Sequence, residues 1–370
     1  MDNQGNIIAE KKESEKIHED MTDRNAAKYP RHDLKNTASE GHNKTIAIRG
    51  DIDALPITEE TGVSYASVNP GVMHACGHDC HAAYMLGAAK ILYELRSSFS
   101  GTVKVIFQEG EETGIGAEHL MRSHLLDSVD RIVGLHVTQE YDLGTFAFGY
   151  GVRTAFGAAV RVTIDTAVPG NTGIPAANAL LAAAGTADAI EKAAKEIFPQ
   201  DEKNVLVPTV VRTVRTAVSA AGQGPEARRI PSLVYMEYNF RSHNLNGFKM
   251  LHSVFGKIQQ DIASAFNAVV TVEPLGYDEA VINDDAAVEL AKEVIARRFG
   301  EKAILLTPPR MSGEDFAMYN KKIPGVFLHV GGAVNGNYCP LHTSKTLADD
   351  GVLSQGLLFL LDYVFAYLNA

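Results

Sequence analysis

The sequence lacks several features that define other classes of protein. Its three cysteines, Cys76, Cys80 and Cys339, are too few and too oddly numbered for a disulfide framework, which leaves metal binding, catalysis or packing as their roles. No apolar run approaches the roughly 20 residues that a membrane span requires, so the sequence argues against a transmembrane protein. Residues 1–42 hold no apolar core of the kind that a secretory signal needs, and we therefore expect a cytoplasmic protein.

Basic residues are also in the minority. The chain has 34 Lys and Arg against 45 Asp and Glu, a net charge of -11, and no basic cluster stands out that would neutralise phosphates. This balance argues against nucleic acid as a partner and favours a small-molecule substrate. The length of 370 residues exceeds the usual size of one hydrophobic core, so we expect two domains or one domain with a large insertion.

Short runs rich in β-branched residues predict buried parallel strands early in the chain. They cover residues 45–48, 103–107 and 132–135. A helix separates the first two runs, because Met85, Ala89, Leu92 and Leu95 recur at spacings of three and four. The order strand, helix, strand is typical of a crossover unit and predicts an α/β fold.

The pattern of apolar residues changes beyond about residue 154. Val160, Val162 and Ile164 alternate with polar residues, and the same alternation recurs over 234–241, as in half-exposed antiparallel strands. The other expected elements here are helices over 176–197 and 251–266 and a strand from Val205. This βαββαβ order predicts a small α+β sandwich.

The α/β pattern returns from about residue 277. The expected elements are a helix over 286–299, a strand over 326–330 and a closing helix over 353–368. We therefore predict a discontinuous first domain, made of residues 1–153 and 273–370, around an inserted domain of residues 154–272.

Potential metal ligands follow each early strand of the first domain. Asp51 and Asp53 come after the first, the pair Glu111 and Glu112 after the second, and His136 after the third. In open α/β sheets, sites form at the carboxyl ends of strands, because the loops there converge over the sheet. Carboxylates and imidazoles are ligands that zinc and similar metals accept. The sequence therefore predicts a metal site at this edge.

The run from His74 to His81 lies between the first two strands and adds further donors. Cys76 and His78 flank Gly77, and a tight turn at this glycine would let a thiolate and an imidazole reach one ion. Taken alone, a cysteine near a helix start is more often packed in a core, and paired glutamates more often form a solvated face. Their repetition at successive strand ends favours the metal site.

These runs resemble the motifs of the aminoacylase/carboxypeptidase metallohydrolases. The matching runs are 49–56, 71–79, 107–112, 134–136 and 312–317. The nearest branch holds the hippurate hydrolases, N-acyl-L-amino acid amidohydrolases and indole-acetyl-amino acid hydrolases. The resemblance implies a zinc-peptidase-like catalytic domain with a central mixed sheet, and two divalent metal ions, which could be zinc, manganese, cobalt or nickel. It also implies that the inserted domain is a ferredoxin-like lid that forms a homodimer.

The resemblance implies roles for single residues as well. By motif, the metal ligands would be Cys76, His78, Glu112, His136 and His342. Glu111 would be the general base, and Asp53 would orient a ligand. Arg241 would contact the substrate, and so would Asn171, which stands where the family has a histidine.

The activity that this implies is hydrolysis of the amide bond of an N-acyl amino acid or peptide-like conjugate by a metal-activated water. Two alternatives stay open: a non-catalytic metal-binding relative, and an aminopeptidase or dipeptidase on the same fold. Several residues are expected to lie outside the site, namely His119, His124, His243, His252 and Cys339. The roles of His74, His81 and His329 stay open.

Overall fold

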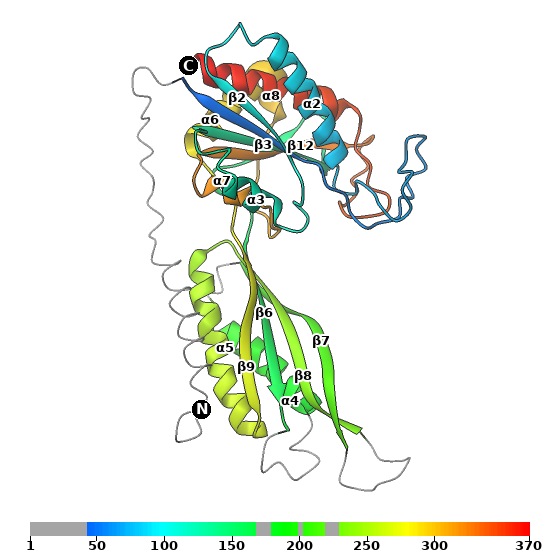
Figure 1. Ribbon diagram of the computed structural model, residues 1–370, viewed down its shortest axis with the longest axis vertical. Helices are drawn as coiled ribbons and strands as arrows, with labels where there is room; N and C mark the ends of the chain where they lie inside the picture. The colour runs from blue at the N-terminus through cyan, green and yellow to red at the C-terminus, as the bar shows by residue number, and fades with distance from the viewer. Residues whose placement is uncertain (1–42, 168–178, 199–202, 219–228) are drawn as a thin grey trace. The chain divides into compact units, whose positions relative to one another are not determined.

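The computed structural model describes residues 43–167, 179–198, 203–218 and 229–370, and Figure 1 labels most of its larger elements. Within these residues the strands form a six-stranded sheet in the order β11-β4-β12-β3-β1-β2, a four-stranded sheet in the order β7-β8-β6-β9, and the pair β10-β5. The large sheet comprises β1 (Thr45–Asp51), β2 (Thr102–Gln108), β3 (Arg131–Asp142), β4 (Phe146–Phe148), β11 (Ile304–Leu306) and β12 (Gly325–Ala333). The pair consists of β5 (Gly151–Val152) and β10 (Ile282–Asn283).

The large sheet is mixed. β1 pairs in parallel with both β2 and β3, β3 pairs in parallel with β12, and β12 pairs antiparallel with β4. Every residue of β1 is buried, as expected of a central strand covered on both faces. The predicted α/β class with a central mixed sheet is confirmed.

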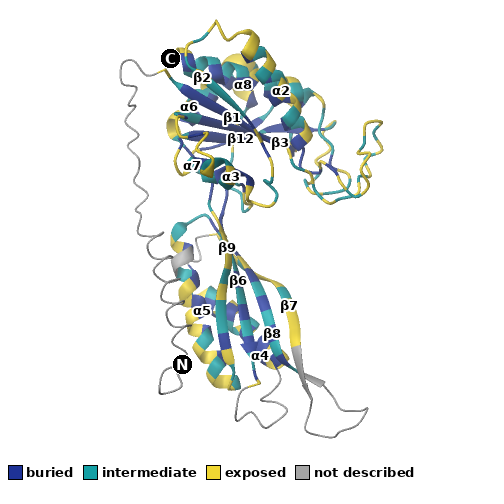
Figure 2. Ribbon diagram, in the orientation of Figure 1, coloured by how far each residue is buried: buried dark blue, intermediate teal, exposed yellow. Residues whose placement is uncertain are grey.

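Helices cover both faces of this sheet. One layer consists of α2 (His78–Glu94), α6 (Asp285–Phe299) and α8 (Gly351–Asn369), and the other of α3 (Gly116–Arg122) and α7 (Ala317–Asn320). Side chains alternate along β1, so that Ile46 and Ile48 pack in the first layer's core while Ala47 packs in the second. Figure 2 shows the buried strands between these helices. The loops at the strand ends are thus held on a rigid base.

Helix α8 corrects one expectation from the sequence. By length and composition it is apolar enough to cross a membrane, although we expected no such segment. In the fold, one stripe of the helix, including Phe359, Leu360 and Tyr363, is buried in the core beside the large sheet. The high hydropathy of α8 therefore has an explanation in core packing, since it contacts α2, α6 and β12.

The second sheet has the predicted βαββαβ order. Its elements are β6 (Phe156–Asp165), α4 (Ala179–Ile197), β7 (Asn204–Val218), β8 (Arg229–Ser242), α5 (Leu245–Phe266) and β9 (Val269–Asp278). The alternation in β6 is confirmed, because Val160, Val162 and Ile164 are buried against the helices and the residues between them are half-buried. Strand β9 continues to Asp278, beyond residue 272 where we expected this segment to end.

Candidate metal centre

The loops after β1 and β2 meet because these strands are parallel neighbours. Asp51 at the end of β1 stands opposite Gln108 at the end of β2. Two residues later, the carboxylate of Asp53 accepts a hydrogen bond from the backbone N–H of Glu112 at 3.1 Å. The acidic residues that follow the two strands are therefore brought together, as we expected from their positions.

Gly77 forms the tight turn that the sequence predicts. Its φ angle is +79°, in the left-handed region that glycine adopts without strain. A Cβ atom added at Gly77 would lie 2.3 Å from Cγ1 of Val137, so no other residue fits without a shift. Cys76 and His78 on either side are both buried. The turn directs both side chains to the same place.

The five residues named as metal ligands come together. Donor atoms of Cys76, His78 and Glu112 all lie within 4.8 Å of one another. Nε2 of His136 lies 3.5 Å from the Cys76 sulfur. Nε2 of His342 lies 3.2 Å from the same sulfur and 3.3 Å from Oε1 of Glu112. One thiol, one carboxylate and three imidazoles thus share a single centre.

His136 reaches this centre from within a strand, which corrects the expectation that its strand ends at Leu135. β3 continues to Asp142 because its parallel pairing with β12 extends past this point, with His136 opposite His329. The side chain is buried on the face of the sheet. His136 therefore approaches Cys76 from a strand of the sheet, whereas Cys76 itself lies in a loop.

Hydrogen bonds set which imidazole nitrogen faces the centre. Nδ1 of His78 lies 3.0 Å from the carbonyl oxygen of Asp53, and Nδ1 of His136 contacts the carbonyl of Val137. Because a carbonyl can only accept, Nδ1 carries a proton in both rings, so Nε2 is the nitrogen that could bind a metal. Neutral imidazoles with a fixed tautomer are the form that binds metals.

His342 arrives from a distant loop and in an unusual conformation. Its φ angle is +64°, which is uncommon for a residue with a side chain. Its backbone N–H donates a hydrogen bond to the carbonyl of Ala75 at 2.8 Å, which joins the late loop to the loop of Cys76 and His78. A strained residue held by such a contact is typical of functional sites.

The donor set fits divalent cations. Among the described residues, Nε2 of His78 is buried without a hydrogen-bond partner, a costly arrangement unless another group binds there. Oε1 of Glu112 and Oδ1 of Asp53 are also buried, and their close contacts are with the imidazoles of His342 at 3.3 Å and His78 at 3.2 Å. Burial, together with Glu112 and Glu111, raises the pKa of the Cys76 thiol. Burial and Glu314 raise the pKa of Glu111 to about 10. The site thus concentrates acidic groups, and a bound cation would favour their ionised forms.

A second acidic cluster adjoins the first, and the sequence alone did not reveal it. Glu111 lies with Glu314 and Asp315, their oxygens within 4.8 Å of one another. Arg49, at 2% exposure, ion-pairs with Asp315 at 2.7 Å, Glu314 at 3.2 Å and Asp51 at 2.7 Å. Arg49 and the two acids lie in runs that match family motifs, which is the one signal that could have indicated a role for them.

His81 belongs to a buried cluster behind the ligands. Its Nε2 accepts a hydrogen bond from the N–H of Val137 at 2.8 Å, and its Nδ1 contacts Asp51. Burial lowers the pKa of His81, and the hydrogen bond that its Nε2 accepts requires the neutral ring. Asp51, His78, His81 and His136 form a fully buried group of possible metal-binding residues. The sequence analysis placed Asp51 among the potential ligands and left the role of His81 open.

A cavity of about 660 Å³ lies over the centre, and Cys76, Glu111, His136 and His342 are among its lining residues. Arg241 of β8 also lines it and forms an ion pair with Asp278 at 2.7 Å. The other residue predicted to contact substrate, Asn171, lies outside the described residues. The arrangement can bind cations beside a carboxylate, Glu111, that faces open space.

The residues expected to lie outside the site are absent from the clusters of possible metal ligands in the described part of the chain. His119 and His252 are exposed, and Nε2 of His243 lies 3.0 Å from the carbonyl oxygen of Arg310. The Cys339 sulfur lies near atoms of its own loop, among them Thr343 Oγ1 at 3.5 Å. His329 lines the cavity over the centre.

We predict that Cys76→Ser and His136→Ala each weaken metal binding more than about 100-fold, because loss of an outer partner alone commonly costs 10- to 100-fold. Elemental analysis after dialysis against a weak chelator measures the loss. Cys339→Ser is the matched control, since it removes a sulfur three positions from His342, and it should keep its metal. Full occupancy in either of the first two variants would remove that residue from the ligand set.

Comparison with known proteins gives consistent matches. The sequence profile of Peptidase family M20/M25/M40 matches residues 47–364. N-acetyl-L-cysteine deacetylase of Bacillus subtilis is 30% identical over 326 residues, covering 85% of this chain and 73% of that protein. IAA-amino acid hydrolase ILR1-like 5 of Arabidopsis thaliana is 31% identical, covering 89% of this chain and 75% of that protein. The crystal structure of a dinuclear metal binding peptidase of the M20 family from Bacillus subtilis aligns with a TM-score of 0.72 at 27% identity, covering 89% of this chain and 82% of that one.

Proposed function

Because the chain belongs to peptidase family M20/M25/M40, we propose that it hydrolyses the amide bond of N-acyl amino acids or related small conjugates with the help of divalent metal ions. The family membership confirms the resemblance seen in the motifs. The matched relatives include a deacetylase of N-acetyl-L-cysteine and an IAA-amino acid hydrolase, and both names describe cleavage at an acylated amino acid. This shared feature supports the choice of substrate class.

One observation carries the proposal: two adjacent glutamates face different partners. Glu112 lies among the donor atoms of Cys76 and His78, whereas Glu111 lies beside Glu314 and Asp315. One carboxylate is therefore available as a ligand while its neighbour is available to accept a proton. This division is what hydrolysis by an activated water requires.

The chemistry divides between metals and protein. Ions held by Cys76, His78, Glu112, His136 and His342 would lower the pKa of a bound water and polarise the scissile carbonyl. Glu111 would accept the proton of the attacking water and deliver it to the nitrogen of the leaving amine. Asp53 contacts both His78 and the Glu112 backbone, so it would hold these two residues in place.

Glu111 has to be ionised before it can act as the base. Burial first, and then Glu314, Asp51 and Asp315, raise its pKa, while Arg49 lowers it. A positive charge nearby favours the ionised form of a carboxyl group, so binding of cations would bring this pKa down. The acidic surroundings thus tie the readiness of the base to the presence of the cations.

The βαββαβ segment would serve as a ferredoxin-like lid and a dimer interface. β7 is an edge strand, and Val205, Val207 and Val211 on it are exposed, so the strand offers both backbone groups and apolar side chains to a second copy. A two-fold dimer is the simplest closure. Light scattering should give twice the chain mass, and Val211→Lys should shift the protein toward the monomer. A wild-type monomer would contradict this part of the proposal.

Arg241 would bind the carboxylate of the substrate, because a guanidinium pairs well with that group and this one lines the cavity over the centre. The substrate would have to compete with Asp278 for it. Asn171, outside the described residues, would be the second substrate contact that the motif implies.

A substrate panel tests the activity. The metal-loaded protein should release free amino acids from N-acetyl amino acids, and should act more slowly on dipeptides with a free amino group. A preference for free amines would favour an aminopeptidase or dipeptidase instead. Bound metal without any amino acid release across a broad acyl panel would favour the non-catalytic alternative and contradict the proposal.

A further inference from the structure

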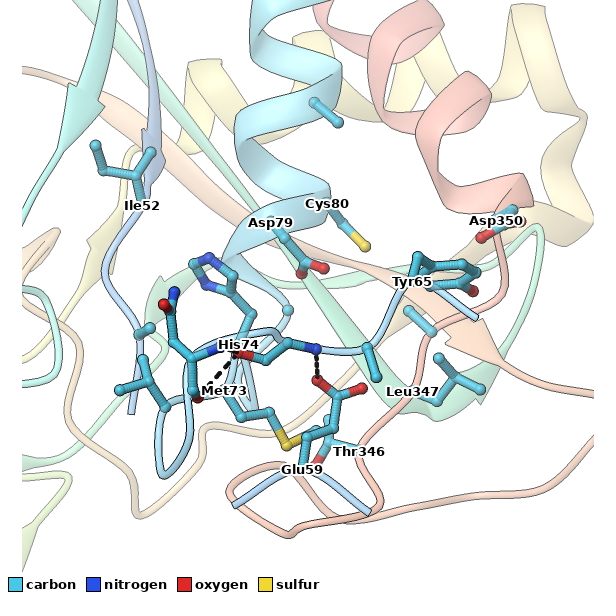
Figure 3. Close-up of a pocket in the computed structure, with 18 of the residues that line it drawn as sticks. Ile52, Glu59, Tyr65, Met73, His74, Asp79, Cys80, Thr346, Leu347 and Asp350 are labelled. Carbon is cyan, nitrogen blue, oxygen red and sulfur yellow. Dashed lines mark hydrogen bonds between the residues drawn. The ribbon is translucent and has the colours of Figure 1, made fainter. Parts of the chain in front are cut away.

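A second cavity, of about 670 Å³, lies on the other side of the loop that carries Cys76 and His78. It shares no lining residue with the cavity over the metal centre. The loop contributes His74, Gly77, Asp79 and Cys80 to its wall, and a volume of this size is typical of sites for small molecules. Figure 3 shows the side chains around this space.

The ionisable groups on the wall are almost all acidic. Glu59, Asp79 and Asp350 line the cavity, His74 is the one residue there that could carry positive charge, and neither Lys nor Arg is among the described lining residues. Tyr65 lies beside Asp350 in Figure 3. An aromatic ring next to a carboxylate is a favourable surrounding for a cation.

Two helices begin at this cavity, and their dipoles oppose the acidic charge. Asp79 is in the first turn of α2, and Asp350 is the N-cap of α8. Each helix start contributes about half a positive charge, so two starts offset about one of the three carboxylates. The cavity therefore keeps a net negative charge.

Gln139 of β3 points to a ligand independently of these charges. It lines the cavity, is fully buried, and neither Nε2 nor Oε1 of its side chain has a hydrogen-bond partner among the described residues. A buried amide without partners is costly, and few occur in native proteins. Its oxygen needs a donor and its nitrogen needs an acceptor, so a ligand that carries both kinds of group would satisfy the amide.

The form of the wall argues against a bare metal ion. In the described part of the chain, the clusters of possible metal ligands include no acidic, histidine or cysteine side chain of this cavity. Apolar side chains, among them Val72, Leu347 and Leu353, make up much of the rest. A ligand that satisfies both surfaces has a charged end and an apolar body.

We propose that this cavity binds a small organic ammonium ion that also carries a hydroxyl or carbonyl group. The ammonium group is neutralised by Asp79 and Asp350, and the ligand satisfies both atoms of the Gln139 amide. A free amino acid fits less well, because its carboxylate would meet three others. The expected ligand therefore differs from the free amino acid that the proposed reaction would release.

Titration calorimetry with phenylalaninol, on the metal-loaded protein, tests this inference. Phenylpropanol, which has the same skeleton without the amino group, is the matched ligand. We expect phenylalaninol to bind roughly tenfold or more tightly than phenylpropanol, since hydrogen bonds to charged groups are the stronger ones. Equal affinities, or no detectable binding of phenylalaninol, would overturn the proposal.

Three variants locate the site. Gln139→Leu and Asp350→Asn should each weaken phenylalaninol binding at least about fivefold, with unchanged metal content. Asp278→Asn, in the cavity over the metal centre, should leave it unchanged. Weakening by Asp278→Asn alone would place the ligand at the metal centre and refute the second site.

Without ligand, the Tm of Gln139→Leu should be no lower than that of the wild type, because the amide has no described partner to lose. A lower Tm would count against the proposal.

Discussion

Replacing Glu111 with Gln is expected to lower kcat by about 10²- to 10⁴-fold, the range typical of a positioned general base. The amide has the shape of the carboxylate but cannot accept a proton. Because Glu111 lies with Glu314 and Asp315 rather than among the sulfur and imidazole donors, the metal content should stay near normal. Steady-state kinetics with an N-acetyl amino acid and elemental analysis measure the two effects.

Glu109→Gln is the matched control for this variant. It removes a carboxylate from the same short run, but Glu109 is exposed, and its loss should leave kcat within a factor of about two. If Glu111→Gln instead loses its metal together with its activity, Glu111 acts as a ligand and the division of roles between the two glutamates is wrong.

Replacing Arg49 with Met is expected to lower the free energy of unfolding by about 3–5 kcal/mol, as measured for other buried ion pairs that lose one partner. The guanidinium is nearly inaccessible to solvent and holds Asp51, Glu314 and Asp315 together. Methionine fills part of its volume but leaves these three carboxylates without a cation. Urea unfolding of the metal-loaded protein measures the loss.

The loss of unfolding free energy in Arg49→Met should depend on pH. Burial alone would raise the pKa of Asp51, but Arg49 and His81 hold it well below its usual range, so this pair stabilises the fold at neutral pH and less as the solution becomes acidic. Without Arg49, the pKa values of these carboxyl groups rise in the folded state, and the variant loses stability as pH increases. The difference from wild type should therefore be smaller at about pH 5 than at about pH 8.

Arg298→Met is the control for the Arg49 variant. Arg298 pairs with Asp362 at the surface, with its side chain 45% exposed, and exposed pairs contribute little to stability. If the two variants lose similar stability, or if the deficit of Arg49→Met does not change with pH, the carboxylates beside Arg49 do not depend on it for their charge.

The sequence predicted the elements well where one face of a strand or helix is buried. The alternation in β6 specified its buried face correctly, because period-two burial leaves a direct signal in the residues. The apolar face predicted for α2 was partly wrong. Ala88 rather than Ala89 is buried, and Leu95 lies exposed beyond the end of the helix. Tertiary packing against α8 decides which alanine faces inward.

The metal donors were predictable because each follows or lies close to a strand end, and parallel strands bring their ends together. The ion pairing of Arg49 could not be predicted, because its partner Asp315 is 266 positions away. No local sequence pattern indicates a pairing over that distance. The second cavity could not be predicted from the sequence either, since Gln139 appears there as one more residue of a strand.

The hydrogen bond between His342 and Ala75 has a consequence for how the protein is made. Residues 76–136 supply four of the proposed ligands, but the fifth follows the whole βαββαβ segment and all six strands of the large sheet. During synthesis, at about 5–20 residues per second, the centre therefore stays incomplete until residue 342 has left the ribosome. Metal loading is thus a late event, and a chain released before residue 342 would lack the contact that joins the two loops.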